Sequence, residues 1–451
     1  MTYRWGCAVL VMLCLAAPLR AQEEAPEEEE PSLKPKLEFG FEAKAHYRDS
    51  DLNRFAVPFR FEPNMLPLGQ SQGFEETVNA GSHLEISTVT LLVDATWGDG
   101  LAAHGKIDFI DLYDRNPTSS DGKTDVDEAW VRFGIEPEPA TLAPRGGAYL
   151  KIGKMPKLER QDDRHLESYG LVSTAFNRFE DTGAELGLNL GRHVYVKATA
   201  TQGNPVFLRD PNALAGDNGT PARRQPFPDP ELKSGIVILY DAEVEDLDVD
   251  GDLELGGGVG VRFADEGGVN GVDFLAWGYQ RNLAETVELE GTFYGGDLDL
   301  LNGPGNATPF PALHGDEKRE AGANVWVYFG GLSFFGQFVD QEIAGLPRTG
   351  LEAEVAWRFE LPLWLSIGDR QLFTFVAPAA RYSELDNDFR NHPNTPAPSL
   401  AWDWKKLDAG LRVGIIPGAD LTVEYADHEF ILGNGAKRDN NEFLTTFRWR
   451  V

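Results

Sequence analysis

The last nine residues of the chain, 443–451, read Phe-Leu-Thr-Thr-Phe-Arg-Trp-Arg-Val and alternate between two kinds of side chain. In an extended strand, one face would carry the large apolar residues of this stretch, which are Phe443, Phe447, Trp449 and Val451. The other face would carry Arg448 and Arg450. An aromatic face opposite a charged face is typical of a strand with lipid on one side and water on the other. The alternative, an edge strand of a soluble sandwich, would leave these aromatic side chains without cover.

The same alternation with period two recurs along the chain. The clearest runs are residues 36–47, 184–190, 253–263, 287–293, 351–359 and 407–415. Each run places apolar side chains on one face and polar or small ones on the other, which predicts strands and not helices. The pattern therefore predicts an all-β fold, a closed antiparallel transmembrane β-barrel of about 16 strands, within a range of about 16–18.

Connections of two lengths separate these runs. Short, turn-forming breaks lie at 330–331 and 417–420, and they are expected to be periplasmic turns. Long polar stretches are expected to be extracellular loops, and these are residues 50–81, 203–230, 302–318 and 386–399. Aromatic residues near the strand ends are expected to form girdles at the two membrane interfaces, with packing inside the fold as the alternative. These residues are Trp97, Tyr113, Trp130, Tyr149, Trp326, Trp402 and Trp404.

The N-terminal residues have a different composition. Residues 1–21 combine a short basic start with an uncharged apolar run, 5–17, which predicts a secretory signal peptide. Residues 22–36 are rich in glutamate and proline and are expected to form a disordered periplasmic tether. The barrel is then expected to cover 37–451. Both cysteines, Cys7 and Cys14, lie in the predicted signal, so neither a disulfide nor a thiolate metal site is expected.

Charge and motifs exclude several other functions. The net charge of −31 argues against nucleic acid as a partner. The histidines are scattered without metal-binding spacing and no G-x-S-x-G is present, so we expect no metal, no cofactor and no enzymatic activity. The glycine-rich run 256–260 lies within an alternating stretch. We interpret its glycines as relieving crowding on a barrel wall and not as a phosphate-binding loop.

The middle of the chain carries a family resemblance. Residues 148–157 read Ala-Tyr-Leu-Lys-Ile-Gly-Lys-Met-Pro-Lys, a charged stretch continues to Glu180, and an amphipathic strand follows. This order, together with 127–133 and 447–450, resembles the phosphate-selective porin O/P family and related bacterial outer-membrane porins. The resemblance implies a trimeric barrel of about 16 strands, with a loop folded into the lumen and passage of small anions. The chain departs from the family by lacking a dense ladder of arginine and lysine.

The charged stretch supplies the candidate pore constriction. Its candidate residues are Arg160, Asp162, Asp163, Arg164, His165 and Arg178, with Glu159 and Glu167 as further charged members. If the stretch folds inward, rows of opposite charge would orient solutes at the narrowest point. The alternative is a solvated outer loop with local ion pairs, and sequence alone does not decide between them.

These observations predict an outer-membrane porin, a water-filled channel for passive diffusion of small hydrophilic solutes or ions. Weak charge selectivity is expected. Wall carboxylates such as Glu352, Glu354 and Glu424 favour cations, and the alternative is anion preference if Arg160 and Arg164 stand at the narrowest point. The expected partners are outer-membrane lipid, the barrel assembly machinery, the solutes and other copies of the chain in a homotrimer. The other functions considered are a ligand-binding or adhesive barrel with a plugged lumen, and an outer-membrane enzyme.

Overall fold

The structure is a computed structural model and describes 21 stretches of the chain. These are residues 35–51, 54–56, 74–76, 81–98, 100–110, 124–141, 147–161, 164–176, 180–203, 223–224, 233–234, 243–244, 253–266, 269–282, 289–290, 317–343, 345–362, 365–368, 370–388, 402–431 and 435–451. The predicted signal peptide and almost all of the predicted tether lie outside the described residues.

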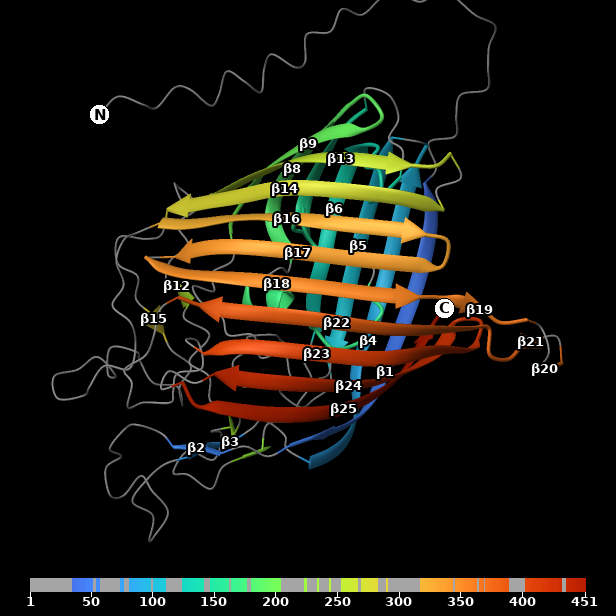
Figure 1. Ribbon diagram of the computed structural model, residues 1–451. Coiled ribbons are helices and arrows are strands. Elements are labelled where there is room, and N and C mark those ends of the chain that lie inside the picture. The colour runs from blue at the N-terminus through green and yellow to red at the C-terminus, as the bar shows by residue number, and fades with distance from the viewer. Residues whose placement is uncertain are drawn as a thin grey trace, which may run out of the picture. The chain divides into compact units, whose positions relative to one another are not determined.

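Sixteen long strands of the described residues form one sheet (Figure 1). They are β1 (Lys36–Ser50), β4 (Gly81–Trp97), β5 (Leu101–Ile110), β6 (Thr124–Gly134), β7 (Ala148–Pro156), β8 (Glu180–Leu190), β9 (Val194–Thr201), β13 (Glu254–Ala264), β14 (Asn270–Asn282), β16 (Glu317–Phe329), β17 (Leu332–Ile343), β18 (Leu346–Trp357), β22 (Phe375–Asn387), β23 (Asp403–Ile416), β24 (Ala419–Ile431) and β25 (Lys437–Arg450). A short strand, β19 (Phe359–Glu360), continues β18 and pairs with the same neighbour, β22.

The sheet closes on itself. Each long strand pairs antiparallel with the next one in the chain, and β1 pairs with both β4 and β25. The closing pairs run from Glu42 with Arg450 to Ser50 with Glu442. Closure satisfies the backbone hydrogen bonds of the first and last strands, which would otherwise be free edges. The predicted fold class, a closed antiparallel β-barrel of 16 strands, is confirmed.

The remaining strands of the described residues are short and lie outside this sheet. They pair as β2 (Arg54–Ala56) with β3 (Phe74–Glu76), β10 (Arg223–Arg224) with β11 (Lys233–Ser234), β12 (Glu243–Val244) with β15 (Leu289–Glu290), and β20 (Ser366–Ile367) with β21 (Arg370–Gln371). The prediction of a membrane strand at 287–293 is therefore wrong. Its described residues, 289–290, form β15 and pair with β12, because period two alone does not tell a barrel strand from a strand in a loop.

We call the end of the barrel that carries Lys36 and Val451 the turn end, and the opposite end the loop end. Short turn-end connections at 330–331 and 417–418 match the predictions. Two turn-end connections, 135–147 and 361–374, are much longer, and the loop-end connection 344–345 has only two residues. The expectation of short turns at one end and long loops at the other therefore does not hold at these three places.

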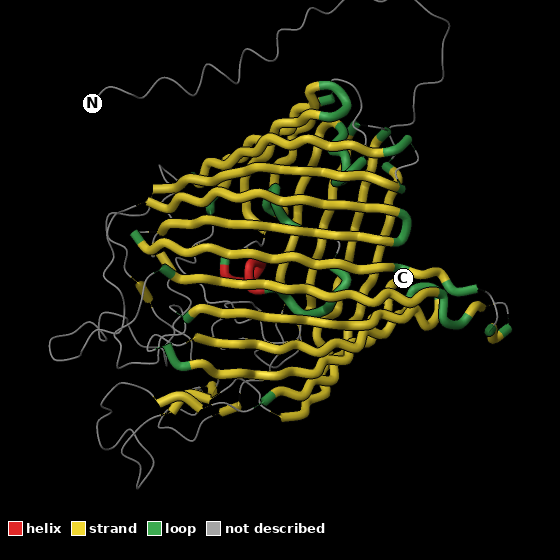
Figure 2. The backbone as a smooth tube through the Cα atoms, viewed as in Figure 1, coloured by secondary structure: helices red, strands yellow, loops and turns green. Residues whose placement is uncertain are grey.

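One helix is present in the described residues, α1 (Leu171–Ala175), and it is buried inside the ring of strands (Figure 2). It is too short to cross a membrane, and no described helix is long and apolar enough to do so. Its position is the first sign that the chain enters the lumen, because its contacts are with the inner sides of β18, β22 and β23.

The two faces of the strands differ as predicted. On β13, Leu255, Val259 and Phe263 are exposed on the outside, whereas Glu254 and Arg262 are buried inside. The four apolar residues of the last strand also lie outside: Phe443, Phe447, Trp449 and Val451. Trp449 meets Phe41 of β1 edge to face, with ring centroids 5.7 Å apart. The outward orientation of this strand is observed, and its role in membrane assembly stays a prediction.

The predicted aromatic girdles are wrong for five of the seven named residues. Tyr149, Trp326, Trp402 and Trp404 are buried on the inner face, and Trp130 lies inside against His104. Of the other two, Trp97 is half-buried and Tyr113 lies outside the described residues. Exposed aromatic residues do occur near the strand ends, but they are different ones: Phe133, Phe263, Phe329, Trp357 and Trp449 at the turn end, and Tyr47, Phe109, Tyr382 and Phe443 toward the loop end.

Glycines on the inner wall make room for tyrosine rings. A Cβ added at Gly260 would overlap the ring of Tyr195, and the same holds for Gly256 with Tyr279. The Tyr195 hydroxyl donates to Asp273 at 2.7 Å. The crowding predicted for the glycine run 256–260 is therefore observed, and each ring gains a fixed position from which its hydroxyl reaches a carboxylate.

We expect Gly260→Val to displace the Tyr195 ring and break its bond to Asp273. Overpacking of this kind costs about 1–3 kcal/mol. The unfolding free energy in lipid vesicles, measured by denaturant titration, checks this. Gly105→Ala is the control, because no atom lies within 4 Å of its added Cβ. Equal stability of the Gly260 and Gly105 variants would show that the ring does not need this space.

Candidate functional site

The described residues of 157–176 form an inner segment that leaves β7 and runs along the inside of the barrel. Its polar contacts reach β13, β14 and β16 first, then β17 and β18, and then β24, β25 and β1. At the helix α1 they return to β22 and β18. Most of this segment is irregular backbone, so its N–H and C=O groups need partners from outside the segment. The inner wall supplies many of them.

The segment is anchored first at Lys157 and Glu159. Lys157 Nζ donates to Glu254 Oε1 of β13 at 2.5 Å. Glu159 is fully buried and accepts the hydroxyl of Tyr279 at 2.5 Å, while its backbone oxygen accepts Asn324 Nδ2 at 2.5 Å. These bonds bring the chain away from β7 and onto the wall formed by β13, β14 and β16.

His165 marks the middle of the segment. Its backbone N–H donates to Glu354 Oε1 at 2.9 Å, and its Nδ1 lies 3.1 Å from the same oxygen. Its Nε2 lies 3.1 Å from the hydroxyl oxygen of Ser333 on β17. The next residue, Leu166, is buried against Ala356. Both ring nitrogens of His165 therefore contact side chains of the barrel wall.

Two consecutive residues, Glu167 and Ser168, attach to the far wall. The carboxylate of Glu424 on β24 accepts both of their backbone N–H groups, at 2.9 and 3.3 Å, and also the Ser168 hydroxyl. The Glu167 carboxylate pairs with Arg448 at 3.1 Å and with Lys44 at 3.4 Å. The segment therefore bridges to β24, β25 and β1, the strands at which the barrel closes.

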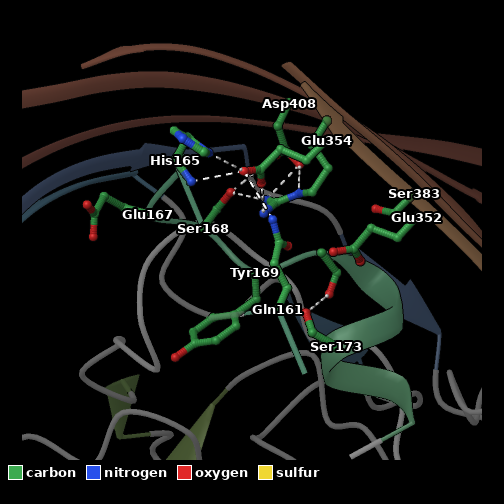
Figure 3. A network of polar contacts seen from close by, with 12 residues as sticks. Gln161, His165, Glu167, Ser168, Tyr169, Ser173, Glu352, Glu354, Ser383 and Asp408 are labelled. Atoms are coloured by element: carbon green, nitrogen blue, oxygen red, sulfur yellow. Dashed lines mark hydrogen bonds and ion pairs between the residues drawn. The ribbon is translucent and has the colours of Figure 1, made fainter. Parts of the chain in front are cut away.

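Arg381 of β22 joins the wall to the segment. Its guanidinium donates to the Ser168 hydroxyl at 2.7 Å, lies 2.9 Å from Asp408 and 3.4 Å from Glu354, and is fully buried. Figure 3 shows Ser168, Glu354 and Asp408 converging on this network. Asp408 has a second cation, Lys406, at 3.0 Å. One buried guanidinium thus connects three strands and the inner segment.

The helix α1 completes the attachment. At its start, the N–H of Val172 donates to Glu352 Oε2 at 3.2 Å. At its end, Arg348 donates to the carbonyl oxygen of Ala175 and lies over the ring of Phe176. Wall side chains therefore satisfy groups that a helix leaves open at its two ends.

Three wall glutamates thus have a different role from the one expected. Glu352, Glu354 and Glu424 were expected to line open water and attract cations. They are buried, and each accepts backbone N–H groups of the inner segment. The expectation that these three side chains face open water is therefore wrong, because the segment covers them. Cation preference itself stays a prediction.

The predicted constriction residues fall into four groups. Arg160 pairs with Glu180 of β8 and lies 3.5 Å from Glu128 of β6. Arg164 lies over the Tyr169 ring, 3.9 Å from its centroid, and Figure 3 shows that Tyr169 points away from the polar network. His165 is held by the wall. Asp162, Asp163 and Arg178 lie outside the described residues.

Inner side chains of β5 and β6 are partly accessible to solvent. Side chains of these strands keep part of their surface, 25 % for Lys106 and 17 % for Asp127, which form an ion pair. Behind the segment, Arg381 and Asp408 keep none. Arg160, which lies next to these strands, keeps 24 % of its side-chain surface.

One group of three carboxylates among the described residues is close enough to hold a metal ion. It consists of Asp127, Glu128 and Glu180. Arg160 lies among them and pairs with Glu128 and Glu180, and Lys106 pairs with Asp127. These two cations already supply the positive charge that such a group needs, so the arrangement is explained without a metal.

Comparison with known families and with curated proteins finds no match for the sequence. Solved structures similar to the chain include the outer membrane channel DcaP of Acinetobacter baumannii, with 10 % identity, coverage of 93 % of this chain and 98 % of that one, and a TM-score of 0.47. OprB of Pseudomonas putida has 9 % identity, coverage of 92 % and 94 %, and a TM-score of 0.49. OmpT of Vibrio cholerae has 11 % identity, coverage of 92 % and 98 %, and a TM-score of 0.47. These similarities concern the fold of the chain alone and say nothing about its substrate or activity.

Proposed function

We propose that this chain is a porin of the bacterial outer membrane, a water-filled channel through which small hydrophilic solutes or ions diffuse passively. The observation that carries the proposal is a closed 16-stranded barrel whose outside is apolar and whose inside is charged. A barrel of this size is wide enough to leave an aqueous lumen. The inner segment narrows that lumen, and the partly exposed charges of β5 and β6 mark where water remains.

We further propose that the chain is related to the phosphate-selective porins and forms a homotrimer after removal of residues 1–21. The inner segment follows the strand end Gly153-Lys154-Met155-Pro156. A strand end of this kind followed by a charged stretch is the sequence order on which the resemblance to these porins is based, so it supports the relationship. The proposal includes outer-membrane lipid around the barrel and insertion by the barrel assembly machinery. It also includes residues 22–36 as a periplasmic tether. We propose no enzymatic activity for this chain.

Single-channel recording in a planar lipid bilayer tests the porin proposal. A porin gives stepwise, long-lived conductance that grows with salt concentration, because ions cross through water. An adhesive or ligand-binding barrel with a plugged lumen inserts without such steps. Folded protein that enters the bilayer and yields no conductance would contradict the porin proposal and favour the plugged barrel.

We place the constriction between the inner segment and the wall of β5 and β6. Replacing Arg160 and Arg164 with alanine is then expected to raise cation preference. One charge acting over 4 Å in water is worth about 1 kcal/mol, which is roughly fivefold in the ion permeability ratio. The reversal potential across a salt gradient measures this, and the effect should shrink near 1 M salt, where the screening length is about 3 Å.

The matched control for this pair is Arg319→Ala. Arg319 is an exposed arginine at the loop end of β16 whose side chain pairs with Glu317. It has the same charge as Arg160 and Arg164 but does not belong to the inner segment, so its removal should leave the reversal potential nearly unchanged. If the control and the pair change the reversal potential equally, the inner segment does not form the constriction.

A further inference from the structure

The two halves of the turn end differ in how far they are filled. One half is occupied by the connection that follows β6. Its Ala140 is buried, has a φ of 54°, and donates its N–H to Asp273 of β14 at 3.2 Å. Its Glu136 contacts Lys151 at 2.5 Å and Lys197 at 3.0 Å. The described part of this connection therefore folds into the barrel and lies against β7, β9 and β14.

Charge holds this connection in place. Burial alone would raise the pKa of Glu136, but the neighbouring charges of Lys197 and Lys151 outweigh it and hold the pKa well below its usual range. Glu136 therefore stays ionised between two lysines of the wall. This half of the turn end is closed by a tightly bonded connection.

The other half contains a cavity of about 580 Å³ between the turn ends of β18 and β25. His165 of the inner segment lies at its border, so the cavity extends along the lumen from the segment toward the turn end. Its volume is within the range of about 300–1,000 Å³ found for small-molecule sites. Polar and apolar residues share its lining.

Three guanidinium groups and one carboxylate line this cavity, those of Arg358, Arg412, Arg450 and Asp420. Asp420 is shared, because Arg412 reaches it at 3.0 Å and Arg448 reaches it at 3.0 Å from the neighbouring strand. Its single negative charge therefore meets two positive ones. The carboxylates that pair with Arg358 and Arg450 belong to Glu360 and Glu42, which do not line the cavity.

The apolar part of the lining lies beside the guanidinium groups. Arg358 lies over the ring of Phe375, 3.6 Å from its centroid, and Ile416 and Pro417 continue this surface. Guanidinium groups bind planar oxyanions through pairs of parallel hydrogen bonds. An apolar surface next to them adds the burial of hydrocarbon.

We propose that this cavity is a binding site for small organic anions that carry a carboxylate on an apolar body. Two features select this class: an excess of guanidinium over carboxylate, and an apolar wall within reach of the same ligand. A role of this site in transport, as a place where the solute binds during its passage, rests on the proposed porin function. Binding itself needs no conduction, so the two proposals are tested separately.

Isothermal titration of the folded full-length protein in detergent tests the ligand class. Hexanoate is the probe, acetate lacks its apolar body, hexan-1-ol lacks its charge, and hexylammonium reverses that charge. We expect saturable binding of hexanoate and at least about tenfold weaker binding of the other three, since one charged hydrogen bond or a few buried methylenes are each worth about a factor of ten. Equal binding of hexanoate and hexan-1-ol, or of hexanoate and hexylammonium, would overturn the proposal.

Three variants locate the site. Arg412→Gln should weaken hexanoate binding about tenfold, and the fold is protected because Asp420 keeps its contacts with Arg448. Asp420→Asn should strengthen binding, because it removes the one carboxylate of the lining. Arg319→Gln, which removes an exposed guanidinium at the loop end, should change nothing.

The outcomes separate the two proposals. A loss in Asp420→Asn as large as in Arg412→Gln, or no difference between Arg412→Gln and Arg319→Gln, contradicts the anion site. Hexanoate binding with the expected order of variants supports the site even if no conductance is found, in which case the porin proposal alone fails. Conductance without any hexanoate binding leaves the porin proposal standing and overturns the site.

Discussion

Arg381→Gln is expected to release the inner segment from the wall. The variant leaves Glu354 and Asp408 buried with one cation fewer, and it removes the donor that holds the Ser168 hydroxyl. Breaking a buried ion pair by removing one partner costs about 3–5 kcal/mol. The closed strand ladder does not depend on this side chain, so the cost is expected to fall on the segment and not on the barrel.

Three measurements follow the release. Limited proteolysis should cut the chain within 164–176, and single-channel conductance should rise because the lumen widens. The barrel itself should stay folded, seen as a difference in gel migration between unheated and boiled samples. Arg381→Lys keeps the charge but not the forked geometry, so it should lie between the wild type and Arg381→Gln.

Arg319→Gln is the matched control for this prediction. Its side chain is 67 % exposed and pairs with Glu317 at the surface, where such pairs are worth at most about 1 kcal/mol. We expect neither proteolysis nor conductance to change in this variant. If Arg381→Gln behaves like the control, the buried network does not hold the segment.

The faces of the barrel strands could be read from the sequence because lipid outside and charge inside impose period two on each strand. The same alternation also places Trp402 and Trp404 correctly when it is applied throughout. Both share the parity of Asp408, which faces inward. The girdle prediction failed because it used nearness to a strand end and ignored parity.

Local irregularities set the limit of this reasoning. On β4, Ile86 is exposed outside whereas Thr88 and Thr90 are buried, although all three numbers are even. The pairing with β1 shifts between Ala43 and Ala45 at this point. Such a bulge adds one residue to one strand and reverses its faces beyond that residue, and no composition signal marked it in the sequence.

The sequence identified the inner segment as charged, but it could not predict whether the segment folds into the lumen or lies outside the barrel as a solvated loop. Water satisfies the polar groups of a surface loop as well as a polar wall does, so composition is the same in both cases. The deciding partners, Arg381, Glu354 and Glu424, come from three strands. Their meeting depends on the register of the whole sheet, which a single sequence does not reveal.

Val259→Arg is expected to destabilise the barrel strongly if lipid surrounds the centre of its strands. Val259 is in the middle of β13, faces outward and is 54 % exposed. An arginine on the lipid face costs about 2–4 kcal/mol at the bilayer midplane and much less near the interfaces. The unfolding free energy in lipid vesicles, obtained from a reversible denaturant titration, measures this cost.

Val269→Arg is the matched control, because it makes the same change at a position with the same exposure, 55 %, just outside the strands. Val269 lies in the connection between β13 and β14, so its arginine should reach water and cost at most about 0.5 kcal/mol, as is usual for surface substitutions. The two valines have nearly the same exposure in the isolated barrel, so the bilayer is expected to supply most of any large difference between the variants. A difference of about 2 kcal/mol or more between the two variants therefore places the middle of β13 in lipid. Equal stabilities of the two variants would mean that the outer face of β13 meets water along its whole length. This result would contradict a barrel that spans a membrane.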